Sequence, residues 1–200
     1  MRTAKSLVNG TVCPMTDSQK GVYLECINEP ESLQYNVPML CRLSQKVDAQ
    51  RLIAAVKAVV HSHPALHMNA CTPKGVPSLR YQEHEIVVGE KAVENVGQEV
   101  AAFIHPFDLE KDPLCRFELL HTPEGDALLY DIHHLVFDGT STRVLSEQIL
   151  RVYQGEACPE ETLTVFDAAE SELAQKGTDE YRAAQAYFAQ KLDFASAECD

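Results

Sequence analysis

Apolar residues recur at helical spacing in several segments of the chain. Between Asp48, which is a good helix-capping residue, and Pro64, which ends a helix, they fall on a single face. The same periodicity predicts a helix that stops before Pro106 and a later helix that Thr140 or Ser141 caps. The apolar positions of these helices are Leu52, Ile53, Val56, Val59 and Val60, then Val93, Val96, Val100 and Ile104, and then Val144, Leu145, Ile149, Leu150 and Tyr153.

Helices are also predicted near both ends of the chain. Residues 16–19, Thr-Asp-Ser-Gln, have the spacing of a capping box, so a helix should begin there and run to about Ile27. The stretch from Thr162 to Phe194 is helical in character, with acidic residues in its first turns.

Segments of β-rich composition separate these helices and predict strands. Residues 35–43 and 78–88 have this composition, and the second segment follows a Gly-Val-Pro turn at 75–77. A hairpin comes next, with arms at 114–121 and 127–132 and turn residues between them. The second arm leads through a histidine-containing loop into the helix that ends at Gly155.

Composition and charge narrow the class of protein. The 200 residues are 45% hydrophobic and 24% charged, which suits one globular domain with a sizeable core. The sequence has no apolar run of the ~18 residues that a membrane span needs, and residues 1–10 lack the apolar core of a secretory signal, so we expect a cytoplasmic protein. A formal charge of −13 argues against a nucleic-acid partner.

The cysteines and most histidines do not form a metal-binding pattern. Seven cysteines are scattered without a C-x-x-C pair, and we expect reduced, mostly buried thiols. His61, His63 and His67 cluster at a predicted helix end, which explains their spacing better than ligation does. The expectation is therefore that no metal is bound. The cysteines are Cys13, Cys26, Cys41, Cys71, Cys115, Cys158 and Cys199.

The strongest candidate for chemistry is the stretch His133-His134-Leu135-Val136-Phe137-Asp138-Gly139. An imidazole accepts and returns a proton near neutral pH. Because neighbours on a strand point to opposite faces, at most one of His133 and His134 can face a substrate while the other faces the core. Without the rest of the motif, the simplest interpretation is two hydrogen-bonded strand-end histidines and an Asp138 that caps the next helix.

The full pattern His-His-x-x-x-Asp-Gly at a strand-to-helix junction resembles the signature of condensation domains of nonribosomal peptide synthetases, in the chloramphenicol-acetyltransferase-like superfamily. The resemblance covers most of residues 13–192, with order and spacing in agreement. The other matching blocks are Pro14-Met15-Thr16-Asp17-Ser18-Gln19, Tyr35-Asn36-Val37-Pro38, Ser62-His63-Pro64-Ala65-Leu66-His67, Pro106-Phe107-Asp108-Leu109 and Pro113-Leu114-Cys115-Arg116.

The resemblance implies one lobe of a two-lobed, amide-forming acyltransferase with a tunnel between its lobes. Carrier proteins would present a donor acyl thioester and an acceptor amine on phosphopantetheine, and no cofactor would be bound. His134 would be catalytic and face the tunnel. His133, Asp138 and Gly139 would be structural residues of the loop.

Two positions depart from the family pattern. An arginine that commonly pairs with the motif aspartate is Ser62 here, and a second arginine is His67. A buried Asp138 would then need another partner, because an unpaired buried carboxylate is costly. Arg116, Arg143 and His67 are the candidates.

The expected fold is an α/β layer structure, with a mixed or antiparallel sheet covered by helices on one side. We expect a leader at 1–12, a lobe at 13–194 and a frayed end at 195–200, where a second lobe would follow. The lobe face left exposed would favour self-association.

Several alternatives remain open from the sequence. An epimerization domain shares the histidine motif, and a standalone acyltransferase of the same superfamily is possible. A heterocyclization domain is disfavoured, because its motif replaces the histidines with aspartate. From a different class, the chain is compatible with a non-catalytic lobe that docks carrier proteins, which Ser62 would favour.

Overall fold

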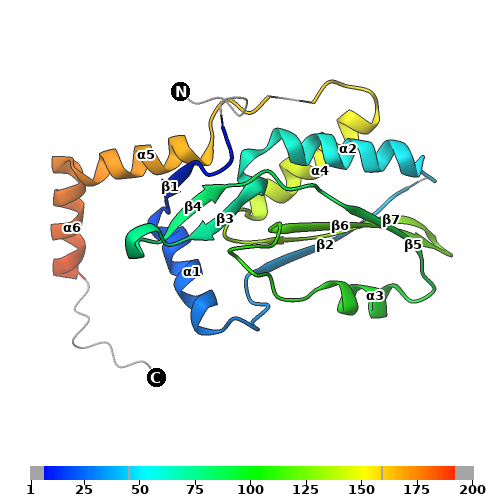
Figure 1. The fold of residues 1–200 in the computed structure, drawn as a ribbon, viewed down its shortest axis with the longest axis horizontal. Coiled ribbons are helices and arrows are strands. Elements are labelled where there is room, and N and C mark those ends of the chain that lie inside the picture. Colours follow the sequence, from blue (N-terminus) through cyan, green and yellow to red (C-terminus); the bar gives the residue numbers. More distant parts are fainter. Residues whose placement is uncertain (1–6, 45, 159, 192–200) are drawn as a thin grey trace.

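The computed structural model describes residues 7–44, 46–158 and 160–191. This part of the chain forms a four-stranded sheet, a smaller three-stranded sheet and helices around them (Figure 1). The helices are α1 (Asp17–Asn28), α2 (Ala49–Ser62), α3 (Val96–Phe103), α4 (Gly139–Tyr153), α5 (Val165–Lys176) and α6 (Asp179–Lys191). The strands are β1 (Val12–Pro14), β2 (Asn36–Arg42), β3 (Met68–Cys71), β4 (Ser78–Tyr81), β5 (Val88–Ala92), β6 (Cys115–Thr122) and β7 (Gly125–His133).

The larger sheet has the order β2-β7-β6-β5 and is mixed, as the sequence predicted. Strand β7 pairs antiparallel with β2 on one side and with β6 on the other, whereas β5 joins β6 in parallel. Both edges of β7 are therefore hydrogen-bonded along its length. The register places Asn36 opposite His133 and Arg116 opposite Asp131.

Both faces of the larger sheet are covered, although the sequence predicted helices on one side only. Leu128, Tyr130 and Ile132 of β7 lie in the core that α2 and α4 complete. The alternate residues Ala127 and Leu129 lie in a second core with side chains from α3. Figure 1 shows α2 and α4 on one side of the sheet and α3 on the other. The prediction was wrong because apolar residues occupy both faces of β7, and both faces then need cover.

Side-chain caps fix the starts of the helices. Thr16 and Gln19 form the predicted capping box of α1, and Asp48 caps α2 as predicted. Helix α4 is capped by Asp138 rather than by Thr140 or Ser141. The reason is spacing, because the Asp138 carboxylate reaches the free backbone N–H three residues later.

Two segments divide differently from the sequence prediction. The stretch 78–88 forms two strands in two sheets, since β4 belongs to the small sheet and β5 to the large one. The backbone N–H of Gln82 donates to the His67 carbonyl and extends the β3–β4 register by one pair, after which the chain leaves the small sheet and enters β5 at Val88. The C-terminal helical stretch is two helices, with Gly177 as the C-cap of the first. The last predicted helical residues, 192–194, lie outside the described residues.

The small sheet, β1-β4-β3, holds the N-terminal strand of the described chain beside helix α5. Val12 pairs with Arg80, and the Gly10 backbone N–H donates to the Tyr81 carbonyl, so the folded part begins before the expected boundary at residue 13. Phe166 of α5 is buried in the core beneath this sheet. Helix α6 follows α5 after a short turn, buries none of its residues and extends away from the sheets (Figure 1). The expected frayed end, 195–200, lies outside the described residues.

None of the helices in the described part of the chain has the length and the apolar content that crossing a bilayer requires.

The core against α2 and α4 should carry a large share of the stability. Leu119→Ala removes a fully buried side chain from β6, and we expect a loss of about 3 kcal/mol in the free energy of unfolding. Leu163→Ala, at a position 66% exposed, is the matched control and should change it by less than about 0.5 kcal/mol. Urea unfolding of the three proteins measures both values, and equal midpoints would contradict the assignment of this core.

Candidate active site

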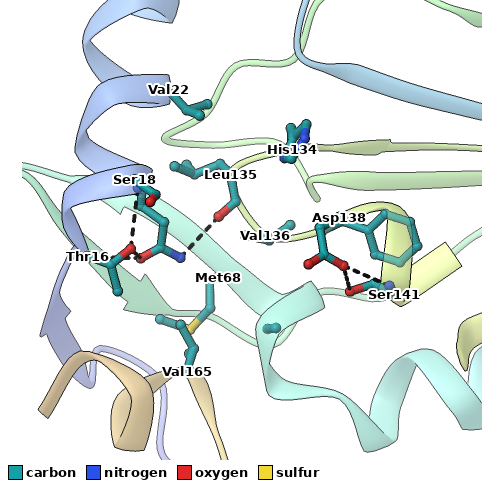
Figure 2. Close-up of a pocket in the computed structure, with 13 residues that line it drawn as sticks. Thr16, Ser18, Val22, Met68, His134, Leu135, Val136, Asp138, Ser141 and Val165 are labelled. Carbon is teal, nitrogen blue, oxygen red and sulfur yellow. Dashed lines mark hydrogen bonds between the residues drawn. The ribbon is translucent and has the colours of Figure 1, made fainter. Parts of the chain in front are cut away.

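The histidine motif lies where β7 ends and the chain turns into α4. His133 is 4% exposed and His134 is exposed to solvent, so the two side chains face opposite ways as strand alternation predicted. His134 lines an open pocket of about 340 Å³. Figure 2 shows this pocket, with His134, Leu135 and Val136 of the motif loop opposite Ser18 and Val22 of α1.

Backbone hydrogen bonds hold the loop at several successive residues. The N–H of His133 donates to the Leu114 carbonyl at 3.0 Å, and that of His134 donates to the Tyr35 carbonyl at 2.8 Å. The N–H of Val136 then donates back to the His133 carbonyl at 3.1 Å. These hydrogen bonds fix the backbone before and after His134, and so fix the place from which its exposed imidazole projects.

The capping box of α1 is connected to the same loop. Gln19 accepts the Thr16 backbone N–H with its side-chain oxygen at 3.0 Å, and its Nε2 donates to the Leu135 carbonyl at 3.1 Å. One glutamine thus closes the helix start and ties it to the motif. This places the opening block of the sequence in direct contact with the histidine loop.

His133 is a buried, neutral imidazole. Its Nδ1 accepts the Leu135 backbone N–H at 3.1 Å, and its Nε2 lies 3.6 Å from Sγ of Cys26. Burial, with a smaller contribution from His134, lowers the pKa of His133 to about 4. The ring makes a T-shaped contact with Phe107, with 5.8 Å between the ring centroids.

Asp138 is exposed, and its carboxylate is a helix cap. Oδ1 accepts the Ser141 backbone N–H at 2.7 Å and the Ser141 hydroxyl at 2.6 Å (Figure 2). These bonds lower the pKa of Asp138. The carboxylate is therefore held by the two donors of Ser141, and it joins the loop to the first turn of α4.

The structure gives other partners to the three cations expected to pair with Asp138. Arg116 Nε lies 3.7 Å from Oδ2 of the buried Asp131, and Arg143 Nη1 lies 2.9 Å from Oε1 of Glu147 on its own helix. The buried His67 accepts the His84 backbone N–H with Nδ1. The expectation failed because it assumed a buried Asp138, and an exposed cap needs no cation.

A polar cluster under the motif was missed by sequence reasoning. Asp131 is fully buried, and Nδ2 of Asn36 donates to its Oδ2 at 2.6 Å. The Arg116 guanidinium lies 3.6 Å from the centroid of the Phe107 ring and donates to the His105 carbonyl at 2.8 Å. Burial raises the pKa of Asp131. The available signal was an aspartate two residues before His133, which alternation places on the same face.

Ser62, which stands where the family commonly has an arginine, is hydrogen-bonded within its own helix. The Ser62 hydroxyl donates to the Val59 carbonyl of its own helix at 2.7 Å. The neighbouring His63 lies between Oε1 of Gln148 at 2.5 Å and Oε1 of Glu161 at 3.5 Å. His63 and Glu161 line a second pocket, of about 240 Å³, that shares Asp138 with the first.

Within the described residues, His, Cys, Asp and Glu form no group of three suited to a metal ion.

A mixed sheet with helices on both faces and a histidine loop at a strand end define an α/β lobe of the chloramphenicol-acetyltransferase-like type. A family model for the condensation domain matches residues 9–198. The chain therefore belongs to the condensation domain family. Tyrocidine synthase 2 of Brevibacillus parabrevis is 32% identical over 179 residues, and surfactin synthase subunit 2 of Bacillus subtilis is 30% identical over 169 residues.

The chain is short compared with these relatives. The alignments cover 88% and 82% of this chain but only 5% of each synthase. Among solved structures, the starter condensation domain of rhizomide synthetase has a TM-score of 0.78 at 17% identity, over 90% of this chain and 48% of that one. The first condensation domain of the calcium-dependent antibiotic synthetase gives a TM-score of 0.79 at 19% identity, over 96% and 49%. The fold is shared, and this chain spans about half of each solved domain.

The low pKa of His133 should make stability depend on pH. The pKa of the ring is near 6.5 in the unfolded state and near 4 in the folded state, so between pH 6.5 and pH 4 the unfolded state is protonated while the folded state is not. This contribution to stability is complete above pH 6.5 and is lost as the pH falls towards 4, which amounts to roughly 3 kcal/mol at about 1.4 kcal/mol per pH unit.

His133→Asn tests this contribution, because asparagine places an acceptor near the Nδ1 position and does not titrate. We expect the stability advantage of the unmodified protein over His133→Asn to shrink by roughly 3 kcal/mol between pH 7.5 and pH 4. Urea unfolding at a series of pH values measures it. His67, whose burial also lowers its pKa to about 4, titrates in both proteins and cancels. Parallel pH profiles would contradict a buried neutral His133.

Asp138 should behave as an exposed cap in substitution experiments. Asp138→Ala removes the acceptor for Ser141 and should lower the free energy of unfolding by about 1 kcal/mol. Asp138→Asn retains a good N-cap and should stay close to the original value. Thermal and urea unfolding of both variants separate the two. A loss of several kcal/mol in either variant would show that the carboxylate balances a buried cation.

Proposed function

We propose that this chain is the histidine-bearing lobe of a condensation domain that forms an amide bond. The donor acyl thioester and the acceptor amine would each be tethered to the phosphopantetheine of a carrier protein, and the lobe itself would bind no cofactor. The observation that carries the proposal is the position of His134. Its imidazole is exposed at the pocket, and backbone hydrogen bonds fix the chain before and after it. Membership of the condensation domain family, with peptide synthases as relatives, supports it.

His134 has a modest chemical task in this reaction. An α-amino group has a pKa of ~8, so an appreciable part is already the neutral nucleophile near pH 7. The amine nitrogen attacks the thioester carbonyl carbon, and the nitrogen must lose a proton before the thiolate leaves. A fixed imidazole beside the amine can accept a hydrogen bond from the N–H that is to lose its proton. The same hydrogen bond orients the amine towards the thioester carbonyl carbon.

A second lobe would complete the site. The pocket beside His134 is open in this chain, and solved condensation domains are about twice as long as the stretch that they share with it. We infer that another lobe covers this pocket and forms the second wall of the tunnel. Its closure would exclude water from the thioester.

The departure at Ser62 does not favour a purely docking role. Ser62 is bonded within its own helix, and Asp138 keeps the donors of Ser141 as partners. The loop that carries His134 therefore remains braced without the arginine. An amide-forming enzyme fits this arrangement better than a degenerate lobe.

The central test is His134→Ala in the two-lobed protein. Because the side chain is exposed, we expect little change in stability but a fall in amide formation of roughly a hundredfold or more. Single-turnover rates with donor- and acceptor-loaded carrier proteins, measured beside melting temperatures on the same preparations, report both quantities. A near-original rate with a much lower melting temperature would make His134 structural and contradict the proposal.

The chain alone should be inactive. One wall of a tunnel cannot exclude water or hold two tethered substrates together, so the 200 residues by themselves should form no amide product. Incubation with both loaded carrier proteins, followed by mass spectrometry of the released dipeptidyl species, checks this. Turnover similar to that of the two-lobed protein would mean that the complete site lies within this chain.

A further inference from the structure

Cys26 of α1 contacts the buried motif histidine, His133. Its side chain is half-buried, and Sγ lies 3.6 Å from Nε2 of His133. The same helix holds the motif at a second point, where Gln19 donates to the Leu135 carbonyl. Helix α1 therefore contacts the loop on both sides of His134 in the sequence.

The hydrogen bonds around His133 determine which ring nitrogen carries the proton. Leu135 N–H donates to Nδ1, so Nδ1 must present a lone pair. Since burial keeps the ring neutral, its one proton is on Nε2. In the contact with Cys26, the Nε2–H of His133 is then the donor and the Cys26 sulfur is the acceptor. A proton on Nδ1 would instead point at the hydrogen of the Leu135 N–H.

The tautomer of His133 affects the exposed histidine through the backbone. His134 and Leu135 are consecutive, and their N–H groups bond the Tyr35 carbonyl and His133 Nδ1 respectively. A proton on Nδ1 would remove the acceptor of Leu135, and the turn that follows His134 would lose one of its fixed points. The position of the His134 ring depends on that turn.

We propose that Cys26 is a positioning residue for the motif, which holds His133 in its Nε2–H tautomer and thereby fixes the loop that carries His134. The effect on His134 chemistry rests on the proposed function, whereas the tautomer and the Leu135 bond do not. Cys26 acts through His133 and has no contact with the substrate in this scheme.

Nuclear magnetic resonance of the 200-residue chain reads the tautomer directly. Long-range proton–nitrogen correlations distinguish a protonated ring nitrogen from one with a lone pair, and His133→Asn assigns the signals of residue 133. We expect Nε2–H in the unmodified protein and in Cys26→Ser, which keeps an acceptor. In Cys26→Val, which fills the space without an acceptor, we expect the Nδ1–H form to appear.

Hydrogen exchange of the Leu135 amide gives a second readout. Cys26→Val should accelerate it by about fivefold, the factor for one neutral hydrogen bond, and Cys26→Ser should leave it unchanged. The His133 amide, bonded to the Leu114 carbonyl, is the internal reference and should not accelerate. Cys71→Val, which removes another half-buried thiol, is the matched control and should alter neither readout.

Several results would overturn the proposal. An Nδ1–H tautomer in the unmodified protein does so without any variant. The proposal is also overturned if Cys26→Val leaves the tautomer and the Leu135 exchange rate unchanged. The same holds if either comparison variant, Cys26→Ser or Cys71→Val, has the effect expected of Cys26→Val. Finally, the His133 reference amide must not accelerate as much as the Leu135 amide. None of these measurements uses amide formation, so an inactive two-lobed protein would contradict the proposed function and leave this inference standing.

Discussion

The hydrogen bonding of β7 on both of its edges is the constraint on which the site depends. A strand paired with β2 and β6 along its length cannot rotate, and its side chains must alternate between the two faces. Asp131 and His133 therefore point to one face. His134, the next residue, points to the other and reaches solvent at the pocket.

The face that carries Asp131 and His133 changes character along the strand. Towards the hairpin it is apolar and packs on α3, whereas near the motif it holds Asn36, Arg116 and Asp131. Buried polar groups are tolerated when they are hydrogen-bonded, and one oxygen of Asp131, Oδ2, accepts a hydrogen bond from Asn36 of the neighbouring strand β2. This cluster supports the motif from below while the pocket side stays free for a ligand.

Helix α1 and helix α4 hold the loop from its two ends. Gln19 and Cys26 contact it from α1, and Asp138 caps α4 at the other end. The loop is thus fixed by hydrogen bonds of ordinary strength and does not need a buried ion pair at Asp138. A condensation domain with serine at position 62 can keep its histidine in place by these means.

The sequence by itself determined the elements with strong local signals. The capping box of Thr16 and Gln19, the apolar face of α2 and the hairpin of β6 and β7 all follow from spacing, because local hydrogen bonds and periodicity decide them. The histidine motif was equally visible, and strand alternation was enough to predict that its two imidazoles face opposite ways.

Only the tertiary structure decided which residues meet. The division of 78–88 between two sheets depends on pairing with distant strands, which no local pattern reports. Two contacts join segments that are separated in the chain: Arg116 with Asp131, and Cys26 with His133. The exposure of Asp138 depends on how the lobe packs around it. Sequence spacing measures neither, because burial and register arise from the packing of the whole lobe.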